Sequence, residues 1–116
     1  MKNRPLRERL GFAAEGLRTG WLRERSFGTQ TLAALVAFLM LILLRPPAFW
    51  WALVAVVAAM VLALELLNSA VEGVIDLLHP GLHPEIKAIK DMIAGPVLIV
   101  SLAALAVAAS LLVVVL

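Results

Sequence analysis

Three long apolar runs alternate with charged segments along this chain. They cover about residues 29–45, 48–67 and 92–116. Each run, with its helical flanks where needed, can cross a hydrocarbon core of about 30 Å as an α-helix. Because lipid offers no hydrogen bonds to a backbone, helices are the economical spanning structure for such runs. The pattern therefore predicts an all-α membrane protein with three transmembrane helices.

The segment before the first run has a helical periodicity instead of a continuous apolar run. Its apolar residues share one side of a predicted helix: Leu6, Leu10, Ala13, Leu17 and Trp21. This predicts an amphipathic helix on the membrane surface, with its arginines near anionic headgroups. We therefore divide the chain into a surface segment over residues 1–28 and a three-helix transmembrane domain over residues 29–116.

The second apolar run leads directly into a polar helical segment with the sequence ELLNSAVEGVID. We expect this helix to continue beyond the membrane as far as residue 78. At about 100° per residue, its polar positions fall within an arc of roughly 80° on one helix face. These positions are Glu65, Asn68, Glu72 and Asp76. Ionisable groups at this depth usually mark function, and clustered acids repel one another unless a cation lies among them. A divalent metal carrying a phosphorylated substrate fits this face.

Composition and charge agree with a membrane protein. The chain has 116 residues, of which 63% are hydrophobic, and it has no cysteine. A soluble domain of this length could not cover so much apolar surface, and disulfide frameworks and thiolate metal sites are excluded. Most of the ten Lys and Arg residues precede the first span, and Lys87 and Lys90 lie between the second and third. The positive-inside rule therefore predicts a cytoplasmic N-terminus and an external C-terminus.

Polar residues that membrane anchoring does not explain gather at one predicted depth, the cytoplasmic rim. They are Glu24, Glu65, Asn68, Glu72, Asp76, His83, Lys87, Lys90 and Asp91. Carboxylates suit Mg²⁺, which takes one or two of them together with substrate phosphates, and lysines hold phosphate as point charges. This combination predicts phosphoryl transfer to a lipid hydroxyl. The chain has no P-loop, Rossmann or HExxH motif.

Three stretches resemble a known family, the small prokaryotic integral-membrane lipid kinases, which comprise diacylglycerol kinases and undecaprenol kinases. The stretches are ELLNSAVEGVID at 65–76, HPEIKAIKD at 83–91 and AGPVL at 94–98. The pattern E-x-x-N-[ST]-A-[IV]-E-x-x-x-D, with K-D opening the next span, is long and specific. The resemblance covers nearly the whole chain. It implies a homotrimer of three-span subunits, with active sites at subunit contacts and MgATP as phosphoryl donor.

Carried onto matching positions, the resemblance also implies roles for individual residues. Glu24 and Glu72 would bind the metal ions, Glu65 would act as general base, and Asn68 would orient the reacting groups beside it. The expected nucleotide-binding residues are Lys90, Asp76, Asp91 and His83. The chain departs from the family pattern at two positions, where it has Pro96 and Ile89 and the family usually has small residues. Both changes affect packing near the lipid entrance and leave the proposed catalytic groups intact.

The residues leave several functions open. The leading hypothesis is a kinase that converts diacylglycerol to phosphatidic acid at the inner face of a bacterial inner membrane, without a nucleic-acid partner. Undecaprenol is an alternative acceptor, because both lipids present one hydroxyl at the interface. A small oligomeric cation transporter or channel should instead place its acids near the bilayer midplane. In a scaffold, the acids would pair with a partner's lysines. For Asp76, pairing with a cation near the helix end is as good an interpretation as nucleotide binding.

Overall fold

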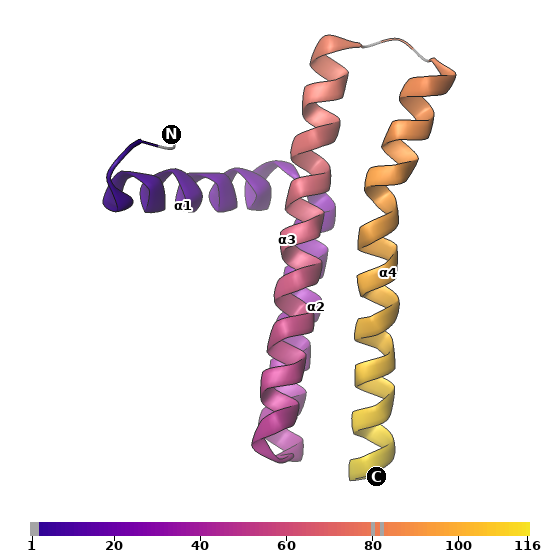
Figure 1. Cartoon of the computed structure of the whole chain (residues 1–116). Helices are drawn as coiled ribbons and strands as arrows, with labels where there is room; N and C mark the ends of the chain where they lie inside the picture. Colours follow the sequence, from indigo (N-terminus) through magenta and orange to yellow (C-terminus); the bar gives the residue numbers. More distant parts are fainter. Residues whose placement is uncertain (1–2, 80, 82) are drawn as a thin grey trace.

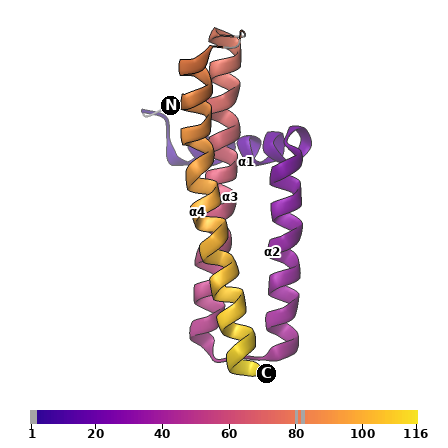
Figure 2. The same cartoon turned by 90° about the vertical axis from the view of Figure 1, so that its right-hand side faces the viewer.

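The computed structural model describes residues 3–79, 81 and 83–116, and within them the backbone forms four helices. They are α1 (Leu6–Arg23), α2 (Arg25–Leu44), α3 (Ala48–Leu78) and α4 (Pro84–Val115). Helices α2, α3 and α4 run lengthwise beside one another, and α1 projects sideways from this bundle (Figures 1 and 2). The predicted all-α architecture, three apolar helices plus an N-terminal helix, is confirmed.

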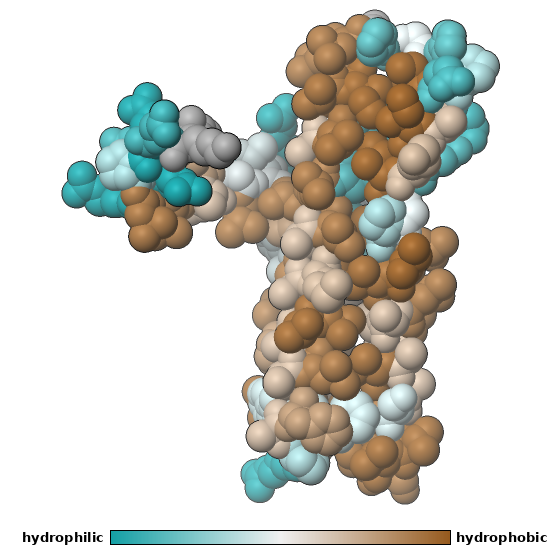
Figure 3. All heavy atoms as spheres, viewed as in Figure 1, coloured by the Kyte–Doolittle hydropathy of each residue, from teal (hydrophilic) through white to brown (hydrophobic). Residues whose placement is uncertain are grey.

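The three long helices have the length and hydropathy of membrane spans. They contain 20, 31 and 32 residues and are strongly apolar, whereas about 20 residues cross a bilayer. On the face drawn in Figure 3, hydrophobic residues cover most of the bundle, and hydrophilic residues gather along α1 and near the α3–α4 connection. Side chains exposed in this way require a cover of lipid or of other protein chains. The chain is therefore a multi-pass membrane protein.

The helix breaks lie at residues with non-helical backbones. Glu24 separates α1 from α2 with an extended conformation (φ −110°, ψ 110°), so a single residue changes the direction of the chain. Arg45 ends α2 in the left-handed conformation (φ 51°, ψ 52°), and its N–H donates to the carbonyl of Leu41 at 2.9 Å. Pro46 and Pro47 follow, as is common after such a helix end. These two breaks set the direction of α1 and the antiparallel course of α2 and α3.

Helix α3 is the centre of the fold, because it packs against α1, α2 and α4. Five hydrophobic residues are buried among those that the structure describes, and three of them, Leu41, Trp50 and Leu111, form one cluster. These residues lie near the α2–α3 turn and the C-terminal end of α4, far from the α3–α4 connection. Helix–helix contact in lipid depends on packing more than on hydrophobic burial. This cluster therefore joins the three long helices at the end of the bundle where α2 turns into α3.

We expect Leu41→Ala to destabilise the bundle by about 1–3 kcal/mol, because Leu41 is fully buried and its loss leaves a cavity between three helices. Leu43→Ala is the matched control, since Leu43 lies on the same helix with 67% of its surface exposed. Unfolding of both variants in mixed micelles, followed by circular dichroism against added SDS, measures the difference. Equal midpoints for the two variants would contradict the assigned core.

Candidate active site

The acidic face of α3 enters the bundle at Glu65, whose exposure is 9%. Glu65 is the buried charged residue among the positions that the structure describes. Glu72, two turns further along α3, is half-buried, and Asp76 near the end of the helix is exposed. Because α3 is unbroken from Ala48 to Leu78, the expected single polar face forms. It leads from the interior of the bundle to the surface near the α3–α4 connection.

Carboxylates from two parts of the chain lie near enough to Glu65 for their charges to act on it. Glu72 comes from α3 and Glu24 from the α1–α2 break, and the negative charges of both act on the Glu65 carboxyl. Within residues 3–79, 81 and 83–116, none of these three carboxyls forms a hydrogen bond or an ion pair with a side chain. Like charges in a partly dehydrated place repel one another. The arrangement thus favours a cation supplied from outside the chain.

The three carboxylates do not enclose a metal-sized site by themselves. Over the described ranges, no three Asp, Glu, His or Cys side chains converge closely enough to hold a metal ion. Mg²⁺ in phosphoryl-transfer sites uses one or two carboxylates and completes its shell with phosphate and water oxygens. Glu24 and Glu72 fit such an open site, in which the substrate supplies the remaining ligands.

Asn68 has a buried amide oxygen without a partner. Its Oδ1 is inaccessible to solvent and accepts no hydrogen bond from any group that the structure describes. A buried acceptor in this state costs about 1–3 kcal/mol, so its presence calls for an explanation. Asn68 lies one turn from both Glu65 and Glu72 on the same face of α3. A hydroxyl donor bound beside Glu65 would satisfy it.

An ion pair joins α3 to α4 at the outer part of this face. The Lys90 ammonium donates to Asp76 Oδ1 at 2.5 Å, and the charge of Glu72 also acts on Lys90. Asp76 is therefore paired with a cation, which is one of the two interpretations that the sequence left open. A free carboxylate near the end of α3 would otherwise add to the repulsion, so this pair confines the unbalanced negative charge to the inner carboxylates.

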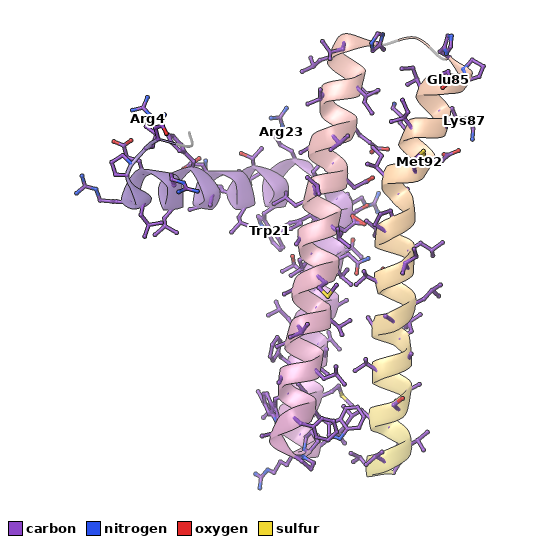
Figure 4. The ribbon with its side chains drawn as sticks, in the orientation of Figure 1. Arg4, Trp21, Arg23, Glu85, Lys87 and Met92 are labelled. Atoms are coloured by element: carbon purple, nitrogen blue, oxygen red, sulfur yellow. The ribbon has the colours of Figure 1, made fainter. Side chains whose placement is uncertain are left out.

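The other residues predicted from the sequence to bind nucleotide lie farther out. Asp91 accepts a hydrogen bond from Lys87 at 2.8 Å within α4, and both side chains are exposed. Lys87 leaves α4 on the side away from α3 (Figure 4). His83 caps α4, since its Nδ1 accepts a hydrogen bond from the Glu85 N–H at 3.1 Å. The structure thus gives Asp91 and His83 local partners and does not bring them to Glu65.

Sequence reasoning assigned no role to Gly20, which the structure places at the site. Gly20 is buried where α1 meets α3, and Leu66, the residue after Glu65, lies against it. Trp21 and Arg23 leave this end of α1 close to α3 (Figure 4). The available signal was a glycine inside an amphipathic helix, a residue that is unfavourable there unless close packing requires it.

Residues 11–112 match the family model described as prokaryotic diacylglycerol kinase. The diacylglycerol kinase of Escherichia coli (strain K12) is 33% identical over 89 residues, which are 77% of this chain and 73% of that protein. A diacylglycerol kinase of Synechocystis sp. is 33% identical over 102 residues, which are 87% of this chain and 58% of that protein. A diacylglycerol kinase of Helicobacter pylori is 28% identical over 90 residues, which are 78% of this chain and 70% of that protein.

We expect Asn68→Leu to stabilise the protein by about 1 kcal/mol in the absence of substrates, because an apolar side chain of similar volume replaces an unsatisfied buried amide. The neighbouring substitution Ser69→Ala is the control, since Ser69 has no unpartnered buried atom in the described structure. SDS-dependent unfolding of both variants gives the comparison. Destabilisation by Asn68→Leu would show that the amide has a partner in the folded protein.

Proposed function

This chain belongs to the prokaryotic diacylglycerol kinase family, and we propose that the polar face of α3 carries its phosphoryl transfer. Because it belongs to this family, the chain is a lipid kinase, namely a diacylglycerol kinase that uses ATP. The observation that carries the proposed site is the buried carboxyl of Glu65 beside the unpartnered amide oxygen of Asn68. Together they offer a proton acceptor and a hydrogen-bond acceptor at one place on the helix.

In the proposed reaction, Glu65 acts as general base on the lipid hydroxyl. Its carboxylate takes the hydroxyl proton while the oxygen attacks the γ-phosphorus of ATP and ADP leaves. The Asn68 oxygen accepts a hydrogen bond from the hydroxyl as the lipid docks. After proton transfer, it accepts one from the protonated Glu65. In both states the amide holds an O–H group beside the reacting atoms, which is a positioning contribution to the rate.

Glu24 and Glu72 are the proposed ligands of Mg²⁺. Both are half-buried, both act electrostatically on Glu65, and the described structure gives neither of them a cation partner. When bound, the metal supplies charge neutralisation to the phosphates of ATP. The two carboxylates come from different elements, the α1–α2 break and α3, so they can bind the metal from two directions. This leaves the remaining coordination positions to phosphate and water oxygens.

Lys90 is the proposed phosphate-binding cation, with Asp76, Asp91 and His83 at the nucleotide side of the site. Lys90 starts from its ion pair with Asp76, and it is near enough to Glu72 to feel its charge. The side chains of Lys90 and Asp76 are 34% and 60% exposed. An ion pair this exposed is worth about 0–1 kcal/mol, so exchange of Asp76 for phosphate oxygens costs little. Asp91 and His83 would bind only the outer parts of the nucleotide.

We also propose a homotrimer with active sites at subunit contacts, in the inner membrane of a bacterium and with a cytoplasmic N-terminus. The exposed apolar faces of the three long helices support an assembly, because such faces pack against lipid or against other transmembrane helices. The excess of Lys and Arg before the first span supports the orientation. The names of the relatives favour diacylglycerol over undecaprenol as acceptor and a kinase over a cation transporter.

Glu65→Gln should lower turnover by about 10²–10⁴-fold, because the amide cannot accept the hydroxyl proton. The KM for MgATP should change little, since Glu65 is assigned no contact with the nucleotide. Transfer of radiolabelled γ-phosphate from MgATP in mixed micelles is measured with diacylglycerol and undecaprenol in parallel. Labelling of undecaprenol alone would contradict the proposed acceptor, and full activity of Glu65→Gln would contradict the proposed base.

Glu72→Gln should raise the Mg²⁺ concentration for half-maximal activity by at least about tenfold, because the amide is a much poorer ligand for a hard cation. Glu85→Gln is the matched control, since Glu85 is an exposed acid in the first turn of α4. Activity is titrated with free Mg²⁺ at constant ATP. The same Mg²⁺ dependence for both variants would remove Glu72 from the metal site.

A further inference from the structure

We propose that Gly20 is a positioning residue, which holds Glu24 beside Glu65 by allowing α1 to contact α3 directly at Leu66. The inference rests on the proposed function in one respect, the role of Glu24 as a metal ligand. Its structural part concerns the contact between two helices and is independent of that role. The contact places the one proposed metal ligand that does not come from α3.

The Leu66 side chain approaches Gly20 closely. A Cβ atom built on Gly20 would lie 2.5 Å from the Leu66 Cδ1 and 3.7 Å from two ring atoms of Phe27. Carbon atoms pack at about 3.5–4.0 Å, so the methyl of alanine would overlap the end of the Leu66 side chain, and either that flexible side chain changes its rotamer or the two helices move apart. Gly20 is also the buried residue of α1, whose other side chains are exposed or half-buried.

Both partners in this contact are coupled to proposed catalytic groups through short, rigid pieces of backbone. The N–H of Glu24 donates to the carbonyl of Gly20 at 2.9 Å, which ties Glu24 to the last turn of α1. Leu66 follows Glu65 directly in the middle of α3. A displacement of α1 away from Leu66 therefore moves Glu24 away from Glu65. Figure 1 shows that α1 reaches the bundle at its C-terminal end and projects away from it.

The remainder of α1 provides a matched control. Gly16 lies one turn earlier, and a Cβ there would meet no atom within 4 Å. Gly16→Ala and Gly20→Ala add the same methyl group to the same helix and remove the same backbone flexibility. They differ in the contact with Leu66. A difference between the two variants therefore reports on the crossing of α1 and α3.

The test compares Gly20→Ala, Gly16→Ala, Leu66→Ala and the double variant Gly20→Ala/Leu66→Ala. We expect Gly20→Ala to raise the Mg²⁺ concentration for half-maximal activity by about tenfold, because small displacements of a positioned group are costly. Gly16→Ala should leave it unchanged. In the Leu66→Ala background, Gly20→Ala should have no further effect, because the overlapping side chain has been removed. Oligomer size is checked for each variant.

A second readout measures the displacement without activity. The chain has no cysteine, so spin labels at Arg9→Cys and Leu77→Cys report the distance between exposed sites on α1 and α3. Labelled chains are diluted into unlabelled ones to restrict the signal to one subunit. The distance distribution should shift in Gly20→Ala, should not shift in Gly16→Ala, and should return in the double variant.

The possible outcomes separate the two proposals. An unchanged distance in Gly20→Ala overturns the inference, and so does a shifted distance with an unchanged Mg²⁺ dependence. An effect of Gly20→Ala that persists in full in the Leu66→Ala background also overturns it, because the overlap is then not the cause. If the unmodified protein phosphorylates neither lipid, the proposed function fails, whereas the distance measurement still tests the crossing.

Discussion

Glu65 places a carboxyl group where little of it reaches solvent, and the cost of a charge in such a place is the constraint on which the arrangement around it depends. A buried carboxylate is stable only with hydrogen bonds, a counter-ion or a metal. Here the charges that act on it are those of Glu72 and Glu24, which add repulsion, while Lys90 of α4 is paired with Asp76. The chain therefore builds a negative site whose balancing charge comes from the substrate complex.

Three features of the backbone allow this site to exist. Helix α3 continues beyond its apolar part, so one rigid element presents Glu65, Asn68 and Glu72 on one face. The extended conformation of Glu24 turns the chain between α1 and α2 and brings a carboxyl from outside α3. Helix α4 returns along α3 and supplies Lys90. The site forms because these three features bring their side chains to the same part of α3.

The sequence predicted what depends on local pattern. Hydropathy located the three apolar helices, and the spacing from Glu65 to Asp76 predicted a shared face, because both follow from the period of one helix. The family followed from the same spacing. Contacts between different helices could not be predicted in this way, because the period of one helix does not determine how another helix packs against it. The pairing of Asp76 with Lys90 was one of two open interpretations, and it depends on how α4 returns along α3. The roles of the individual site residues stay predictions.

The two ends of the bundle differ in how they are held. At the α2–α3 turn, Leu41 is fully buried against Trp50 and Leu111, which is side-chain packing. At the site, the described contacts between α3 and its neighbours include an exposed ion pair and the approach of Gly20 to Leu66. An exposed ion pair contributes little to stability, so it opens at little cost. A kinase must admit both a nucleotide and a lipid, and a contact between α3 and α4 that opens at little cost on the outer part of the polar face suits that requirement.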